Sequence, residues 1–175
     1  YAVVLPAVLL RIAETGQVEN RSAGIPGGLE YNFVRLWFKH HALTPDGKKA
    51  PTFLIAASKD PVEANLDRIQ IVKGWVGTDG TSLEKVYDVA LSDGRKDGSQ
   101  AVGNTVDLET GSYTNSIGTE QLAAVWKDPD YDPDHVAFYY VRALQIPTPR
   151  YSLLDSIALG IDPVETNRPA TIQER

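Results

Sequence analysis

Two alternating segments separated by a tight turn constrain the fold of this chain more than any other feature. From Asp67 to Val76, apolar and polar residues alternate with the two-residue period of a β-strand. Thr78-Asp-Gly-Thr81 follows, and Asp-Gly supplies the positive φ angles that a tight hairpin turn requires. Leu83 to Leu91 then resumes a strand pattern. The sequence therefore predicts an antiparallel β-hairpin over residues 67–91.

Other segments also have the composition of strands. Thr52 to Ala57 is a continuous apolar run of strand length, and His135 to Ile146 is rich in aromatic and β-branched residues. Pro147 and Pro149 end the second segment, because proline cannot donate to a ladder. Residues 105–108 are a candidate short strand. Several short strands separated by turn signals predict a β-sandwich-like fold or a partly open barrel.

A few short helices are expected beside the strands. The segment from Pro6 to Thr15 can form one, and a second is predicted from Glu120 to Trp126 because Thr119 is a good N-cap. A third is predicted from Tyr151 to Leu159, closed by the glycine that follows. Residues 29–43 have an ambiguous period that fits a helix or a strand. The predicted fold class is mainly β with a few short helices.

Three parts are expected along the chain. Residues 1–47 form an N-terminal arm or the remnant of a preceding domain, residues 48–160 a β-rich domain, and residues 161–175 an extended C-terminal arm. The chain starts at Tyr1 and contains no methionine, so we expect a processed or partial polypeptide.

Composition narrows the classes of partner and chemistry. The formal net charge is −6, from 17 basic and 23 acidic residues, which disfavours binding to nucleic acid and to anionic membrane surfaces. Because the chain has no cysteine, it can form no disulfide, thiolate zinc site or cysteine nucleophile. The apolar residues 1–10 are about half the length that spans a bilayer, so no membrane insertion is expected. A buried strand, a core helix or the remnant of a signal sequence each fit them.

An acidic segment precedes the aromatic strand. Its four carboxylates occupy alternate positions, namely Asp128, Asp130, Asp132 and Asp134. This spacing can deliver oxygen ligands to calcium from one loop. The EF-hand pattern fails, however, because Pro133 and Tyr139 stand where it requires glycine and glutamate. Turn chemistry is the alternative interpretation, in which each carboxylate accepts hydrogen bonds from nearby backbone amides.

Histidines and arginines are the other candidate ligands. His40 and His41 are adjacent, so their side chains diverge and rarely chelate one ion; His135 is the third histidine. Arg142 and Arg150 flank the end of the aromatic strand and could clamp an anionic ligand. Ion pairing with the neighbouring aspartates is the alternative.

No complete catalytic constellation is present in the sequence. There is no Gly-x-Ser-x-Gly elbow, and Gly24-Ile-Pro-Gly-Gly28 lacks the flanking strand and helix of a nucleotide loop. Trp75, Trp126 and the run Phe138-Tyr139-Tyr140 could form a platform that stacks against a sugar or a peptide. In a strand, Phe138 and Tyr140 point away from Tyr139, so at least one face of that run is expected in the core.

A set of motifs in fixed order resembles a known family. The matching segments are Lys49–Ala57, Ala64–Trp75, Glu84–Ala90, Val102–Leu108, Tyr113–Gly118, Val125–Pro133, Ala137–Leu144, Ile146–Arg150 and Ala170–Arg175. Over residues 48–175 they are similar to the C-terminal part of a bacterial family catalogued as domain of unknown function 3604.

That resemblance implies an activity that this chain would support rather than perform. The N-terminal part of such proteins resembles PHP-type metal-dependent phosphoesterases, and many are exported to the periplasm or beyond. Their metal-binding motifs are absent here, so the divalent metal would be held outside this chain. The leading hypothesis is a β-rich accessory portion of a PHP-like hydrolase, with the rest of its polypeptide or other subunits as partners. Two alternatives remain: a non-catalytic binding or assembly subunit, and a calcium-stabilised extracellular β-sandwich. A cytoplasmic location is left open.

Overall fold

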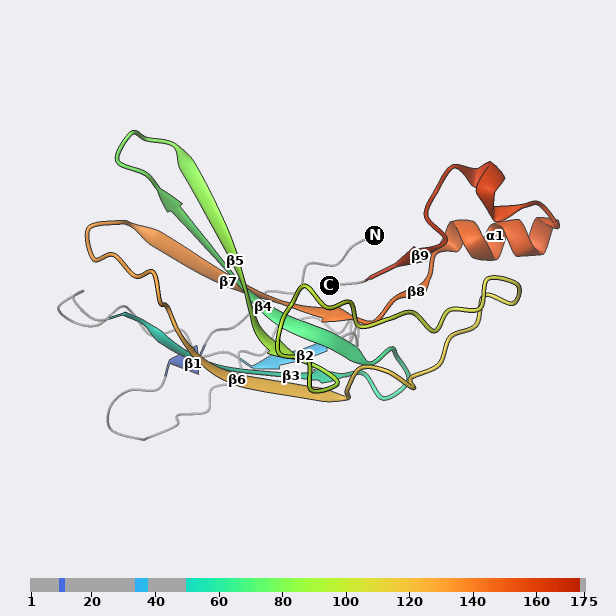
Figure 1. Ribbon diagram of the computed structural model, residues 1–175, viewed down its shortest axis with the longest axis horizontal. Coiled ribbons are helices and arrows are strands. Elements are labelled where there is room, and N and C mark those ends of the chain that lie inside the picture. The colour runs from blue at the N-terminus through green and yellow to red at the C-terminus, as the bar shows by residue number, and fades with distance from the viewer. Residues whose placement is uncertain (1–9, 12–33, 38–49, 174–175) are drawn as a thin grey trace, which may run out of the picture.

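The computed structural model describes residues 10–11, 34–37 and 50–173 (Figure 1). The strands are β1 Leu10–Arg11, β2 Val34–Trp37, β3 Thr52–Lys59, β4 Leu66–Val76, β5 Ser82–Leu91, β6 Gln121–Lys127, β7 Ala137–Gln145, β8 Thr148–Pro149 and β9 Thr171–Ile172. The helices are α1 Tyr151–Leu159 and the 3-10 helix η1 Pro163–Thr166. The prediction of a mainly β fold with short helices is therefore confirmed.

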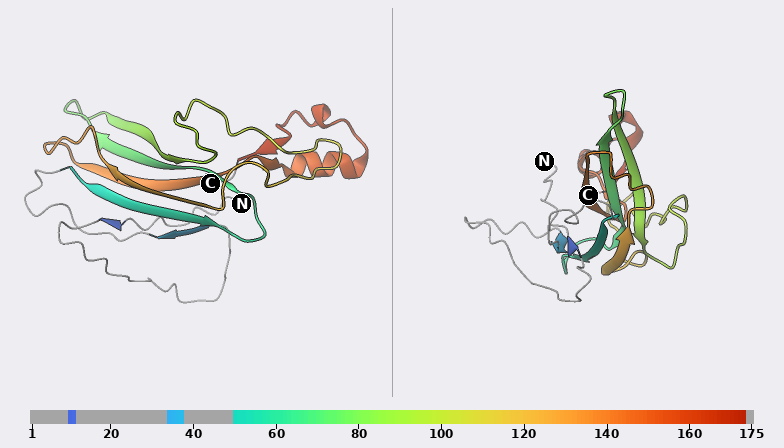
Figure 2. Two further views of the ribbon diagram at one scale, coloured as in Figure 1. Left: turned by 60° about the horizontal axis from the view of Figure 1, so that its bottom comes forward. Right: turned by 90° about the vertical axis from the view of Figure 1, so that its left-hand side faces the viewer.

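Two antiparallel sheets form the body of the molecule. In the first sheet, β3 pairs with β1 and β2 along one edge and with β6 along the other. In the second sheet, β4 lies between β5 and β7. The two sheets lie one above the other in both views of Figure 2, and the strands that the structure describes do not close into a barrel.

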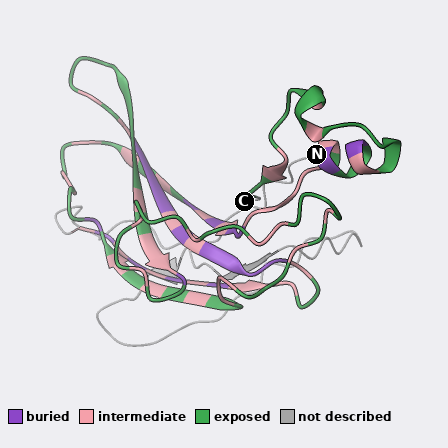
Figure 3. Cartoon of the chain, turned by 45° about the vertical axis from the view of Figure 1, so that its right-hand side comes forward, coloured by how far each residue is buried: buried purple, intermediate pink, exposed green. Residues whose placement is uncertain are grey.

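The core fills the space between the two sheets. Its buried residues come from alternate positions of β3, β4 and β7: Phe53, Ile55, Ala57, Leu66, Ile69, Ile71, Val141 and Ala143. Figure 3 shows this buried stretch running along β4, the central strand of the second sheet. Each fully buried isoleucine stabilises the fold by about 1.5–3 kcal/mol. Burial of one face of each sheet therefore holds the two layers together.

The predicted hairpin is present as β4 and β5, but its turn is longer than expected. The turn closes through a 2.8 Å hydrogen bond from the Gly77 amide to the Thr81 carbonyl. Within this turn only Gly80 has a positive φ, of 81°, whereas a two-residue turn needs positive angles at both central residues. The Asp79 carboxylate instead accepts hydrogen bonds from the Thr81 amide and hydroxyl, which stabilises the wider turn.

The helix predicted over residues 120–126 is wrong, because this segment is strand β6. Every second side chain of β6 is shielded, and its register pairs Phe53 with Trp126 and Ile55 with Ala124. Pairing with the edge of β3 satisfies the backbone of β6 and partly buries Trp126, and this outweighs the local N-capping signal of Thr119. A good cap residue alone therefore did not decide the secondary structure.

Three further expectations about secondary structure also differ. Residues 105–108 form a loop and not a strand. Leu10–Arg11 is a strand paired with β3, which contradicts the helix predicted around it; the rest of that segment lies outside the described residues. Val34–Trp37 pairs with β3, so the ambiguous segment forms a strand where it is described.

A small C-terminal module extends from one end of the sandwich (Figure 1). It comprises residues 148–172, in which β8 pairs with β9, and α1 and η1 lie between them. The predicted helix α1 and its stop are confirmed, because Gly160 adopts a φ of 66° and its amide donates to the Ile157 carbonyl. In the described part of the chain, neither helix is long and apolar enough to cross a membrane.

Candidate functional site

Two lysines stand side by side on the inner face of the second sheet. Lys73 on β4 is directly opposite Lys85 on β5, and Tyr139 on β7 is opposite Lys73 on the other side. Like charges directly opposite each other destabilise a sheet. The acidic segment that joins β6 to β7 supplies the compensating charges.

Asp128, the first carboxylate of that segment, is buried against Lys73. The Lys73 Nζ lies 2.7 Å from the Asp128 Oδ2, and the two side chains are 5% and 0% exposed. The Tyr139 hydroxyl donates to the same oxygen at 2.6 Å, while the Asp130 amide donates to Oδ1 at 2.9 Å. Both oxygens of this carboxylate therefore accept hydrogen bonds from the protein itself. Burial, and secondly the hydrogen bond to Asp128, raises the pKa of Tyr139.

Asp130 forms a second and more exposed cluster. Its Oδ2 lies 2.5 Å from the Lys85 Nζ and accepts the Tyr87 hydroxyl at 2.6 Å. The hydrogen bond from Lys85, and then that from Tyr87, lowers the pKa of Asp130. Burial and the hydrogen bond to Asp130 raise the pKa of Tyr87. Each lysine of the pair thus has its own carboxylate.

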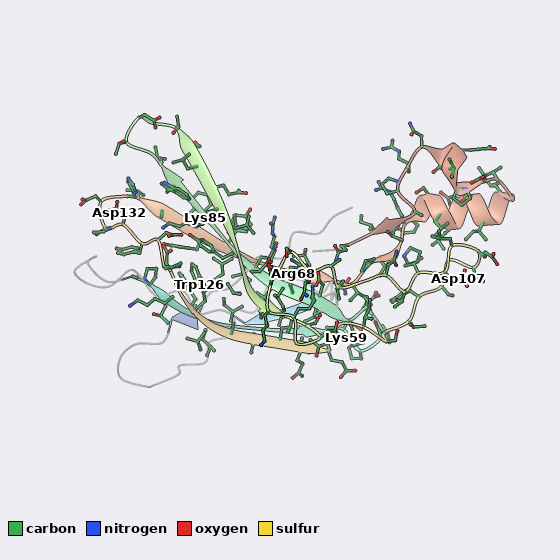
Figure 4. The ribbon with its side chains drawn as sticks, viewed as in Figure 1. Lys59, Arg68, Lys85, Asp107, Trp126 and Asp132 are labelled. Carbon is green, nitrogen blue, oxygen red and sulfur yellow. The ribbon has the colours of Figure 1, made fainter. Side chains whose placement is uncertain are left out.

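Aromatic rings enclose this polar cluster on its inner side. Trp126 stacks on Phe53 with centroids 5.8 Å apart and lies 4.9 Å from the Tyr87 ring. The Lys73 ammonium lies 5.5 Å from the centroid of Trp75 and 5.9 Å from that of Tyr139. Figure 4 shows Trp126 between the two sheets, near Lys85. Both tryptophans of the predicted stacking platform are partly buried: Trp126 packs against the core, and Trp75 lies beside Lys73.

The last two aspartates of the segment lie in the turn that precedes β7. The Asp132 Oδ1 accepts the Asp134 amide at 2.9 Å, and its Oδ2 lies 3.5 Å from Nδ1 of His135. The four carboxylates do not converge: Asp128 and Asp130 face separate lysines. Among the described residues, no three His, Asp or Glu side chains are grouped to hold a metal ion. Calcium binding by this segment stays a prediction, and His40 and His41 lie outside the described residues.

The outer face of the second sheet carries a row of polar side chains. Arg142 on β7, Gln70 on β4 and Asp88 on β5 stand in register. The Arg142 Nε donates to the Gln70 Oε1 at 2.7 Å, and the Gln70 Nε2 donates to the Asp88 Oδ1 at 2.7 Å. Arg68 extends the row with a 3.2 Å contact to Asp88. This row crosses all three strands.

The two arginines predicted to clamp an anion occupy different elements. Arg142 lies in the polar row, whereas Arg150 immediately precedes α1 and donates its amide to the Ala170 carbonyl. In the described part of the chain, neither guanidinium forms an ion pair with a carboxylate. The expected pairing with the neighbouring aspartates is therefore not seen there, and anion binding stays a prediction.

Aromatic residues of β7 divide between the two faces as predicted. Tyr139 packs against the core, while Phe138 and Tyr140 are exposed on the outer face. Their rings are stacked at an interplanar angle of 13°, with centroids 6.4 Å apart. They are the two members of the predicted platform that remain accessible.

A buried aspartate that sequence patterns did not single out connects three segments. Asp67 lies 2.9 Å from the Arg68 Nε and is also paired with Arg95. The Gln173 Nε2 donates to the Asp67 Oδ2 at 3.0 Å. Asp67 thereby anchors the loop after β5 and the segment after β9. Asp67 is the second residue of β4, a strand that also carries Arg68, Gln70 and Lys73, so no local pattern pointed to this role.

The C-terminal module exposes a second surface. Tyr151, Leu159 and Val164 are 82%, 73% and 83% exposed. Five carboxylates of the module and the adjacent loop form no ion pair with any described basic residue: Asp107, Glu109, Asp155, Asp162 and Glu165. Figure 4 shows Asp107 in the loop that runs beside α1. The module therefore presents apolar side chains among negative charges.

Comparison with known proteins identifies one family. A family model described as "Protein of unknown function (DUF3604)" matches residues 41–175. The match includes every element from β3 to β9, so the sandwich and the C-terminal module both fall within it. No curated protein and no solved structure matches the chain.

Proposed function

The chain belongs to the DUF3604 family of proteins of unknown function, and from this premise we propose that it is an accessory β-sandwich of a PHP-like metal-dependent hydrolase. Its role is to dock on the catalytic part and support it. The motif resemblance described above supports the hydrolase part of this proposal, and the exposed surface of the C-terminal module supports the docking part.

The exposed apolar side chains of the C-terminal module are the observation that carries this proposal. Tyr151 and Leu159 stand at the two ends of α1, and Val164 lies in η1 immediately beyond it. Large exposed apolar side chains gathered on one small module among charged residues are a feature of protein interaction sites. Because α1 projects beyond the sheets, a partner can approach it without disturbing the core (Figure 1).

Charge indicates what kind of surface the partner presents. The carboxylates around the module include Asp155, Asp162 and Glu165, while Arg168 is a nearby basic residue. Complementary potentials direct association and exclude wrong partners. The matching surface on the catalytic part is therefore apolar at its centre, with lysine or arginine at its edge.

In this arrangement the catalytic metal belongs to the other part of the protein. There a bound divalent ion would activate water for hydrolysis, as the resemblance implies. The buried network of Lys73, Asp128 and Tyr139 stiffens the sandwich between its sheets. By the same resemblance we propose export to the periplasm, which separation of periplasmic from cytoplasmic fractions tests.

The test uses the native polypeptide isolated from its source. Its intact mass is expected to exceed the 19.1 kDa of this chain, and it should hydrolyse p-nitrophenyl phosphate only with a divalent metal present. The double variant Tyr151→Ser/Leu159→Ser should release the accessory part more readily in limited proteolysis. The matched control is Val136→Ser, because Val136 is equally exposed but lies before β7. A native mass of 19.1 kDa, or metal-independent turnover, overturns the proposal.

A further inference from the structure

Phe138 and Tyr140 form an exposed aromatic surface on the outer face of the second sheet. They are 63% and 39% exposed, and their nearly parallel rings follow one another along β7. Large aromatic side chains at neighbouring outward positions are costly to leave in water, since each could bury 150–250 Å². Their exposure calls for a functional reason.

The strand beside them shows how the rings are held. Gly74 is the cross-strand neighbour of Phe138, and a Cβ atom at Gly74 would lie 2.3 Å from the Phe138 Cζ. The Phe138 ring therefore lies across β4, in space that only glycine leaves open. Val72, the cross-strand neighbour of Tyr140 on this face, is fully buried, as expected beneath a covering ring. The Phe138 ring thus lies over β4, and both rings remain accessible to solvent.

Polar groups border this aromatic surface on two sides. Arg142, Gln70 and Asp88 form the hydrogen-bonded row next to Tyr140, and Glu84 stands opposite Gly74 beyond Phe138. The row fixes the planes of these side chains. In the described hydrogen bonds Arg142 uses only its Nε, so its terminal amino groups remain free to donate.

We propose that this face binds the pyranose rings of a glycan, with Phe138 and Tyr140 as stacking partners. One face of a pyranose is lined with C–H groups that pack on the negative face of an aromatic ring. Its hydroxyls both donate and accept, which suits a rim that combines guanidinium, amide and carboxylate groups. Nucleic-acid bases also stack on aromatics, but the acidic Asp88, Glu84 and the net charge of −6 disfavour a polyphosphate backbone.

Glycan binding on this face is independent of docking by the C-terminal module, because Phe138 and Tyr140 lie on β7 whereas the docking surface lies on α1 and η1. Native gel electrophoresis of the 175-residue chain through gels containing hydroxyethylcellulose, xylan, galactomannan or polygalacturonate tests it. We expect at least one polysaccharide to retard the protein. Tyr140→Ala should lower the affinity for that polysaccharide by about tenfold, the order of loss when one aromatic contact is removed. Tyr140→Phe should retain it, since the ring remains.

Two controls keep the result interpretable. Leu159→Ala removes an exposed apolar side chain from the C-terminal module and should leave retardation unchanged. Arg142→Gln tests the rim without touching the aromatic rings, and should weaken binding while the thermal unfolding midpoint stays the same. Wild-type protein that migrates freely in all four gels overturns the proposal. So does retardation that survives Tyr140→Ala, or a dimer that this variant dissociates, because a second copy would then cover the face.

Discussion

The Lys73 ammonium lies 2.7 Å from the Asp128 carboxylate between the two sheets, although 55 residues separate them in the chain. Both side chains are almost fully shielded from water. A buried charge is tolerated only when it is paired and hydrogen-bonded. The first carboxylate of the acidic segment therefore acts as the counter-ion of a core lysine, and its loss should be felt throughout the sandwich.

Lys73→Met should destabilise the protein by about 3–5 kcal/mol, because it leaves the Asp128 carboxylate buried without its cation. Urea unfolding followed by circular dichroism measures the change. Lys85→Met is the matched control, since its ion pair with Asp130 is half-exposed and should contribute much less than the buried pair. Equal losses for the two variants would contradict a special role for the buried pair. Adding Asp128→Leu to Lys73→Met should recover part of the loss, because both charges are then gone.

Stability should decline as the pH rises above about 10. The pKa of Tyr139 and that of Tyr87 are raised in the folded state by burial and by hydrogen bonds to carboxylates. Tyrosine in the unfolded chain loses its proton near pH 10, while these two phenols keep theirs in the folded state. Their contribution to the free energy of unfolding is therefore full below about pH 10 and is lost as the pH rises above it. Urea unfolding from pH 8 to pH 11 measures the slope. Tyr139→Phe should lower stability at pH 8 by about 1 kcal/mol and make the slope shallower. A slope unchanged in both Tyr139→Phe and Tyr87→Phe would contradict this origin.

Gly118→Ala should destabilise more than Gly94→Ala. Both glycines have positive φ, of 73° and 66°, so either substitution introduces backbone strain of roughly 1–2 kcal/mol. A Cβ at Gly118 would in addition lie 2.8 Å from the Leu66 carbonyl oxygen, whereas nothing lies within 4 Å of one at Gly94. Crowding of that kind adds about 1–3 kcal/mol. Thermal unfolding midpoints compare the two variants, and a larger drop for Gly94→Ala would show that crowding at Gly118 is relieved.

An excess of chelator should leave the thermal unfolding midpoint unchanged. The Asp128 oxygens accept hydrogen bonds from Lys73, Tyr139 and the Asp130 amide, so a calcium ion would have to displace existing partners. A ligand that binds only the folded state must raise its stability. Differential scanning fluorimetry with calcium and with EDTA measures the difference. A midpoint that rises with calcium and falls in Asp132→Asn would instead establish the calcium site.

Local sequence patterns correctly predicted the elements for which periodicity and turn or capping residues indicate the same structure. The hairpin of β4 and β5 follows from alternation and an Asp-Gly turn, and α1 ends where Gly160 takes up left-handed geometry. The helix predicted over residues 120–126 was wrong because its capping signal competed with a partner strand remote in sequence. Cross-strand pairing depends on contacts that no local window contains.

The candidate sites were predictable only in part. Alternation placed Phe138 and Tyr140 on the face opposite Tyr139, which the structure confirms. It did not show that Gly74 leaves room for the Phe138 ring, because this depends on the register of β4 with β7. Nor did it show that Asp67 is paired with Arg95, a contact made by folding the loop after β5 back onto the sheet.

The sequence by itself determined the class of the fold, the faces of its strands and the family to which the chain belongs, because periodicity, turn chemistry and ordered motifs are local properties. Only the tertiary structure decided which partners Asp128 and Asp130 have. Asp128 and Asp130 could serve an ion or a turn as long as their surroundings were unknown. Packing the sheets face to face brought two lysines against them. Lys73 pairs with Asp128 in the shielded interior, and Lys85 pairs with Asp130 where both side chains are half-exposed.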